Sequence, residues 1–144
     1  NEGSISKCFS LGIVSGTTDI GGLVGWNWGE LASITNSYSR GDVKGNQWAG
    51  GLAGINNGTI TKCYSTGNVA GKEMTVGGLV AINYGSSSGS FWDIETSGQT
   101  ASSTGTGKTT LDMKKKAIYT SAGWDFTSTW KITENQDYPK LTWE

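Results

Sequence analysis

The sequence predicts an all-β protein: a right-handed parallel β-solenoid (β-helix) of about three and a half coils, closed by a Trp-rich C-terminal cap containing one short helix. Three observations predict this fold: a glycine-rich composition, a sequence unit that returns about every 26 residues, and short β-prone stretches within each unit. The 144 residues include 23 Gly but only 35% hydrophobic residues, which allows a thin core rather than a thick one. Seven Trp, five Tyr and three Phe are too many aromatic residues for a disordered linker.

The repeat is visible in two segments of each unit. GGLVGWNWG, GGLAGINNG and GGLVAINYG begin at Gly21, Gly50 and Gly77, and ISKCFSLGIVSG, ITNSYSRGDVKG and ITKCYSTGNVAG recur in the same order. Three β-prone stretches separated by glycine fall in one unit, for example Leu23-Val24, Ile34 to Tyr38 and Asp42-Val43. We therefore expect three strands per coil, each paired with the next coil at roughly 4.8 Å. A β-propeller is excluded because its blades need about 40 or more residues.

Stacked coils place equivalent residues in columns. The expected apolar core columns are Leu23, Leu52 and Leu79; Ile20, Ala49 and Val76; and Val14, Val43 and Val69. An aromatic column contains Phe9, Tyr38, Tyr64 and Phe91. A polar column contains Asn1, Asn27, Asn56 and Asn83, whose side-chain amides we expect to hydrogen-bond along the stack. Two residues later, Gly3, Gly29, Gly58 and Gly85 are expected at a turn with positive φ.

The two cysteines are predicted to be free. Cys8 and Cys63 occupy one column, and Ser37 lies on the rung between them. Two rungs separate positions by roughly 9.6 Å, which exceeds the Cα separation of about 7 Å that a disulfide tolerates. We therefore expect small buried thiols rather than a bridge.

The repeat units resemble the GLUG motif, on the segments GGLVGWNWG…NSYSRGDVKG and GGLAGINNGTITKCYSTGNVAG. This motif recurs in bacterial and archaeal surface and secreted proteins, including filamentous-haemagglutinin-like adhesins and IgA1-specific metallopeptidases. The resemblance covers residues 1 to about 92, and the remainder is similar to the segment that commonly closes such arrays. It implies an extracellular, cell-surface or secreted location and a passive or adhesive role. It implies no activity, since the peptidases hold zinc in a separate domain and this chain has no His.

The period ends near Asp93, so we expect repeats over residues 1–93 and a capping module over residues 94–144. Residues 96–110 are mostly Thr, Ser and Gly and indicate a long loop. Thr109 followed by Asp112 resembles a capping box, which predicts a helix over residues 111–119 that buries Leu111 and Ile118 and ends at Gly123.

Short alternating stretches then predict strands at residues 124–126, 130–132 and 141–143. We expect the cap to cover the open core of the last coil with its tryptophans, which are Trp92, Trp124, Trp130 and Trp143.

Composition excludes several function classes. A net charge of −1 and a single arginine, Arg40, give no basic footprint for nucleic acid. No apolar run approaches the roughly 20 residues that cross a bilayer. The loop Ser102–Thr109 is within one residue of a phosphate-binding loop, but it lacks the preceding apolar strand. Convergent catalytic groups are not evident, so we expect neither enzymatic activity nor a cofactor.

Two alternatives stay open for this sequence. Asp93 and Glu95 form a carboxylate pair that could bind calcium. Trp28 and Trp48 lie in turns and are the candidate ligand-binding residues, whereas Trp26 aligns with isoleucines and is expected to be packed.

The expected function is a non-catalytic structural or adhesive repeat module of a cell-surface or secreted protein. The alternative is a glycan- or protein-binding module that uses exposed Trp and Tyr side chains. Expected partners are surface glycans or other copies and domains of the same surface protein. Because residue 1 falls inside a repeat, we expect the chain to be the C-terminal part of a longer protein.

Overall fold

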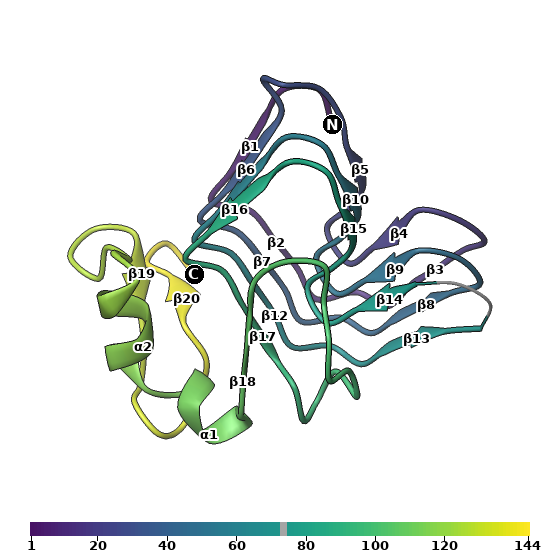
Figure 1. Ribbon diagram of the computed structural model, residues 1–144. Coiled ribbons are helices and arrows are strands. Elements are labelled where there is room, and N and C mark those ends of the chain that lie inside the picture. Colours follow the sequence, from purple (N-terminus) through teal and green to yellow (C-terminus); the bar gives the residue numbers. More distant parts are fainter. Residues whose placement is uncertain (73–74) are drawn as a thin grey trace.

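The computed structural model describes residues 1–72 and 75–144, and it is a parallel β-solenoid of about three turns with a module on one flank (Figure 1). The solenoid strands, in chain order, are β1 (Ser4–Ser6), β2 (Phe9–Ser10), β3 (Val14–Ser15), β4 (Ile20–Gly21), β5 (Val24–Asn27), β6 (Ser33–Thr35), β7 (Tyr38–Ser39), β8 (Val43–Gly45), β9 (Ala49–Gly50), β10 (Ala53–Asn56), β11 (Thr59–Thr61), β12 (Tyr64–Ser65), β13 (Val69–Gly71), β14 (Val76–Gly77), β15 (Val80–Asn83), β16 (Ser86–Ser88) and β17 (Phe91–Asp93).

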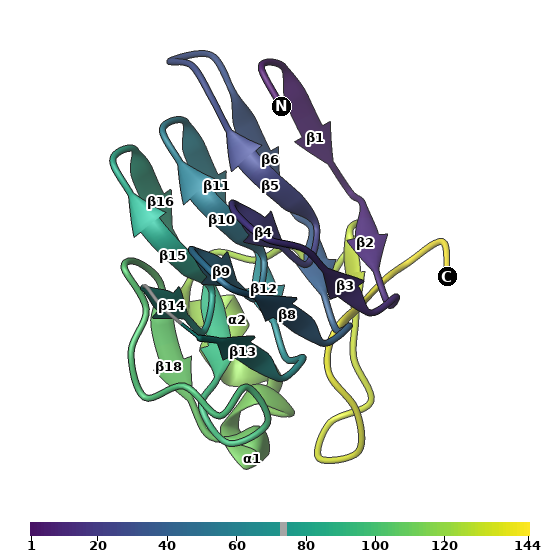
Figure 2. The same cartoon turned by 90° about the vertical axis from the view of Figure 1, so that its right-hand side faces the viewer.

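Strands of successive turns stack into five parallel sheets, and Figure 2 shows the turns side by side. The sheets are β1-β6-β11-β16, β5-β10-β15, β2-β7-β12-β17-β18, β3-β8-β13 and β4-β9-β14. A full turn thus contains five strands rather than the predicted three. One extra break falls at Asn36, whose φ of 47° separates β6 from β7, and another falls at Gly22-Leu23 between β4 and β5.

The predicted register is confirmed. Ile20 pairs with Ala49 and Ala49 with Val76, while Val14, Val43 and Val69 pair in the same way. Apart from Val14, these two columns form a small core between the sheets of β8 and β9, and a second, larger core lies inside the other lobe of the coil. The larger core contains Ile34, Leu52, Ala53, Ile60, Cys63, Leu79, Val80 and Trp92.

The asparagine column forms a continuous side-chain ladder. Asn1 Nδ2 donates to Asn27 Oδ1, Asn27 Nδ2 to Asn56 Oδ1, and Asn56 Nδ2 to Asn83 Oδ1, each at 2.7 Å. At the last rung, Asn83 Nδ2 donates to the carbonyl of Gly85 at 3.1 Å. The amides of Asn1, Asn27 and Asn56 each donate to the next rung, so the ladder has one direction. Asn27 and Asn56 are fully buried, so losing the hydrogen bonds of their side-chain amides is costly.

Only one of the four predicted turn glycines has a positive φ, namely Gly29 at 102°. For Gly58 and Gly85 the glycine is needed for close packing between rungs. A Cβ on Gly58 would collide with the carbonyl oxygen of Ala32, and one on Gly85 with that of Gly58. Gly3 lies on the first rung, and a Cβ there would have no atom within 4 Å.

A column of left-handed backbone positions lies instead at the corner between sheets β1-β6-β11-β16 and β2-β7-β12-β17-β18. It consists of Lys7, Asn36, Lys62 and Gly89, with φ between 47° and 56°. At two rungs, the next residue donates its backbone N–H to a hydroxyl on the following rung: Cys8 to Ser37 and Cys63 to Ser90, at 3.1 Å. The hydroxyl groups of Ser37 and Ser90 therefore support this corner.

The end of the last turn is covered by residues 94–108. Their strand β18 (Thr106–Lys108) pairs in parallel with β17. Ser102 Oγ accepts hydrogen bonds from the backbone N–H groups of Leu79 and Val80, at 3.1 and 2.9 Å. The loop thus satisfies donors that the end of a solenoid would otherwise leave unpaired. Trp92 is the one predicted cap tryptophan that packs against the larger core.

The rest of the predicted cap does not lie over the end of the solenoid. Residues 109–144, the flank module, pack against the sheet that contains the aromatic column (Figure 1). Its elements are α1 (Thr110–Met113), α2 (Lys116–Ser121), β19 (Trp130–Lys131) and β20 (Lys140–Leu141), with the two strands antiparallel. Residues 124–126, predicted as a strand, lie outside any strand.

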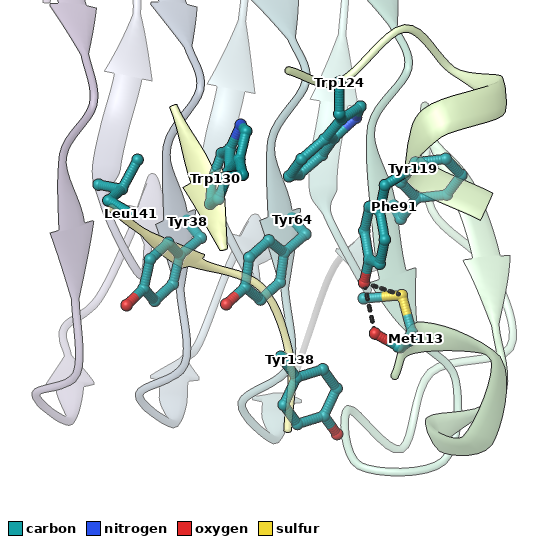
Figure 3. Packing of buried hydrophobic residues seen from close by; sticks show 9 residues of the cluster. All are labelled: Tyr38, Tyr64, Phe91, Met113, Tyr119, Trp124, Trp130, Tyr138 and Leu141. Atoms are coloured by element: carbon teal, nitrogen blue, oxygen red, sulfur yellow. Dashed lines mark hydrogen bonds between the residues drawn. The ribbon is translucent and has the colours of Figure 1, made fainter. Parts of the chain in front are cut away.

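Aromatic rings fill this flank interface (Figure 3). Tyr38 and Tyr64 stack with ring centroids 4.7 Å apart, and Trp130 lies 6.2 Å from both rings. Trp124 lies 4.4 Å from Trp130 and donates its indole N–H to the carbonyl of Gly89. Trp143, also predicted to cover the end, is 62% exposed and lies 5.5 Å from the ring of Phe9. The tryptophans gather here because the aromatic column points outward and needs cover.

The predicted single helix is two short helices. Thr109 is the N-cap as expected, because its side chain accepts a hydrogen bond from the N–H of Asp112. The helix ends at Met113, and α2 begins at Lys116 in a new direction, so the seven-residue spacing no longer selects one face. Leu111 is consequently 60% exposed, and Met113 and Tyr119 are the buried residues.

Replacing Asn56 by Ala is predicted to destabilise the protein strongly. The change removes the bonds to Asn27 and Asn83, and each stranded buried group costs about 1–3 kcal/mol. Thermal unfolding of Asn56→Ala should be compared with that of Asn68→Ala, a matched change at an exposed asparagine. Equal melting temperatures would show that the ladder contributes no stability.

Both cysteines are free, as the register predicts, but only Cys63 is buried, because Cys8 lies on the uncovered first rung. Burial raises the pKa of the Cys63 thiol to about 12. In the native protein at neutral pH, iodoacetamide should therefore modify Cys8 and leave Cys63 intact. Mass spectrometry should find both modified after unfolding without reductant; a native Cys63 adduct would contradict the burial.

Alkaline pH is predicted to loosen the flank module. Burial, followed by the hydrogen bond to Asp93, raises the pKa of Tyr138 to about 12 from its ordinary value of 10.0. The native state therefore holds this proton more tightly than the unfolded chain, and the stabilisation is lost as pH rises from 10 to 12. The difference in melting temperature between the wild type and Tyr138→Phe should narrow over this range; a constant difference would refute it.

Candidate functional site

The most exposed aromatic residues of the repeats lie in a column beside the asparagine ladder. This turn column consists of Glu2, Trp28, Asn57 and Tyr84, each directly after a ladder asparagine. The backbone N–H groups of Trp28, Asn57 and Tyr84 donate to the ladder residue of the preceding rung at 2.8 Å. Trp28 and Tyr84 therefore lie two rungs apart, roughly 9.6 Å. Trp28 is 48% exposed and Tyr84 is 73% exposed.

Trp26 orients the middle of the turn column. Its indole N–H donates to Asn57 Oδ1 at 2.7 Å, and its ring meets that of Trp28 edge-on with centroids 4.7 Å apart. Sequence alignment with Ile55 and Ile82 predicts a packed Trp26, but its side chain is 41% exposed. The register places Trp26 in the column of Ile55 and Ile82, so the predicted alignment is confirmed, but the predicted burial of the side chain is wrong. Trp26 lies on β5, the edge strand of its sheet, so its ring is covered on one side only.

Two columns of hydroxyl groups lie on the sheet that follows the turn column. The first column contains Ser4, Ser33, Thr59 and Ser86, and the second contains Ser6, Thr35, Thr61 and Ser88. Neighbouring hydroxyls are hydrogen-bonded on several rungs, for example Ser33 to Ser4 at 3.2 Å and Thr35 to Ser6 at 3.1 Å. Sequence reasoning missed these columns, although the alternation of Ser or Thr with Ile is visible in the repeats.

The charge near Trp28 is negative. A shallow hollow of about 400 Å³ beside it is lined by Glu2, Trp28, Gly29, Glu30 and Leu31. The turn column and the hydroxyl columns contain no lysine or arginine. This region therefore favours an uncharged ligand over an anionic one.

The structure does not bring Trp28 and Trp48 together. Trp48 lies between β8 and β9, at the other lobe of the coil, and is half-buried with a φ of 50° (Figure 1). Its left-handed backbone matches that of Asp19 one rung earlier, so it belongs to a structural corner.

The other chemical candidates are occupied by structural contacts. Asp93 is fully buried and accepts from the N–H groups of Glu95 and Thr96 and from the hydroxyls of Thr110 and Tyr138. It thereby joins the flank module to the last turn. Residues 102–108 of the predicted phosphate-loop-like segment belong to the end cover, and Thr109 caps α1. Within residues 1–72 and 75–144, no group of three or more His, Cys, Asp or Glu side chains is placed to hold a metal ion.

Comparison with known proteins agrees with this architecture. The GLUG motif matches residues 16–44 and 45–70. A protein of Evansella cellulosilytica described as "Putative Gly-rich membrane protein" is 35% identical over 148 residues, covering 96% of this chain and 14% of the relative. The chain thus spans about one seventh of that relative's length. No solved structure matches the chain.

The described part of the chain has no helix that is long and apolar enough to cross a membrane. The two matched segments together contain strands β4 to β12. Their stacking in register with the flanking rungs gives the motif a defined three-dimensional form. The chain is a parallel β-solenoid that contains two GLUG repeats, at residues 16–44 and 45–70.

Proposed function

We propose that the chain is a non-catalytic structural and adhesive repeat module of a protein exposed at the cell surface or secreted. The observation that carries the proposal is the continuous stack of parallel rungs, with a covered end and a covered flank. Such a stack holds its outer faces rigidly and at a regular spacing. In this role the side chains stabilise the stack or form its outer surfaces, and none acts in a reaction.

Several features support a passive role. The sequence has no His, and the buried Asp93 is committed to four hydrogen bonds that join two parts of the fold. A nucleophile paired with a base, or carboxylates facing each other across a cleft, would be the signature of a hydrolase. The free thiol of Cys63 is buried and its pKa is raised to about 12, which suits a core residue and not a nucleophile.

The exposed location is supported by the GLUG match and by the relative. That relative is described as a membrane protein, and the chain covers only 14% of it. A module of this kind would be one part of a longer surface protein, held away from the membrane by its other regions.

A second function, glycan binding, is favoured by one specific observation. Trp28 and Tyr84 are exposed in one column with Asn57 between them. Exposed aromatic rings combine an apolar face with polar neighbours, which is the character that sugars require.

The surface location is tested on intact source cells. An antibody raised against the recombinant chain should label unpermeabilised cells or the culture medium, and brief protease treatment of intact cells should remove the cell-bound signal. An antibody against a cytosolic protein is the control. Labelling seen only after permeabilisation would contradict an exposed location.

A further inference from the structure

We propose that the turn column and the adjoining hydroxyl columns bind an extended, uncharged β-1,4-linked polysaccharide, whose chain lies along the solenoid axis. The inference rests on the glycan-binding candidate and gives it a ligand class and a binding direction. It concerns a face built from three successive rungs, not a closed pocket.

The spacing of the aromatic rings selects the ligand. Trp28 and Tyr84 are two rungs apart, roughly 9.6 Å along the axis. In a flat β-1,4-linked chain, alternate pyranose rings recur at nearly this distance and present the same face. Equatorial substituents leave axial C–H groups on that face, which can pack on an aromatic ring. Two rings in one column therefore match alternate sugars of one chain.

Asn57 supplies a polar contact between the two rings. Its Oδ1 accepts the indole N–H of Trp26 at 2.7 Å, which fixes the plane of the amide. Its Nδ2 makes no hydrogen bond within residues 1–72 and 75–144, so the amide keeps two donors for a ligand. A sugar located between Trp28 and Tyr84 would place a hydroxyl within reach of this amide.

The hydroxyl columns lie on the sheet that directly follows the turn column in the chain. Thr59 and Ser86 follow the turn column by two residues on their rungs, and their hydroxyls lie 3.3 Å apart. Hydroxyl groups both donate and accept, as sugar hydroxyls do, so either orientation of the chain can be accommodated. Polar groups near the exposed rings of the turn column would orient a bound sugar chain, while the rings supply contact area.

Charge decides between neutral and anionic polymers. The ionisable side chains that line the hollow beside Trp28 are those of Glu2 and Glu30, and both are acidic. A polyuronate or a phosphate polymer would bring like charge to this face, whereas a neutral glucan would not. The same argument disfavours acidic peptides.

The test is isothermal titration of the full chain with cellohexaose. We expect binding of cellohexaose, and no binding of glucose or of polygalacturonate. Trp28→Ala and Tyr84→Ala should each weaken binding about tenfold, and Asn57→Ala about threefold to tenfold. Trp143→Ala, a matched change at an exposed tryptophan outside the face, should bind as the wild type does.

A second measurement needs no variant. Hydroxyl-radical footprinting of the wild type, read by mass spectrometry, should show that cellohexaose protects Trp28 and Tyr84 but not Trp143. Absence of binding, equal loss in Trp143→Ala, or tighter binding of polygalacturonate would overturn the proposal. Positive labelling of intact cells together with no cellohexaose binding would overturn this proposal alone and leave the structural role intact.

Discussion

In-register parallel pairing between successive turns is the constraint on which the rest of the structure depends. Each rung places its residues directly over their equivalents, so one side-chain type per position becomes a continuous column. The asparagine ladder exists because Asn27 lies over Asn56, and the aromatic column exists because Tyr38 lies over Tyr64. A slip of one residue would turn every column to the opposite face of its strand. The close glycines have the same origin, since the carbonyl of Ala32 leaves no room for a Cβ at Gly58.

The register also creates surfaces that must be covered. A column of outward aromatic rings is too apolar to leave in water, and the flank module covers it with Trp124, Trp130 and Leu141. Hydrogen bonds fix the module at both ends of this contact: Tyr138 donates to Asp93, and Tyr38 donates to Glu144. The end of the stack is a separate problem, because unpaired backbone donors need acceptors. Ser102 and strand β18 supply that part, so one C-terminal segment performs two different covering tasks.

The turn column remains uncovered. Trp28 and Tyr84 are exposed, whereas Tyr38 and Tyr64 are buried, although all four belong to columns of the same stack. The difference follows from the flank module, which lies against one sheet and leaves the turn beside the asparagine ladder open. The open column is uncharged apart from Glu2, and hydroxyl groups adjoin it, which is the chemical basis of the proposed glycan contact.

Repetition made much of the fold predictable from the sequence. Equivalent residues such as Val14, Val43 and Val69 identify their column without coordinates, because the chain must pair each unit with the next. The capping role of Thr109 is local in the same sense, since its hydroxyl and the N–H of Asp112 are three residues apart. The free state of Cys8 and Cys63 also followed from the register.

Tertiary structure decided the features that depend on contacts between distant parts of the chain. The left-handed corner falls at Lys7, Asn36 and Lys62, where no shared residue type announces it. Trp124 and Trp130 lie on the flank because the aromatic column faces outward there, and the positions of the tryptophans in the sequence do not indicate which column they cover. The amide of Asn57 became a candidate contact only through Trp26, which lies on the preceding rung. Sequence alone therefore determined the columns, because the unit repeats and each unit pairs with the next, whereas only the folded chain determined which columns are covered and which remain open.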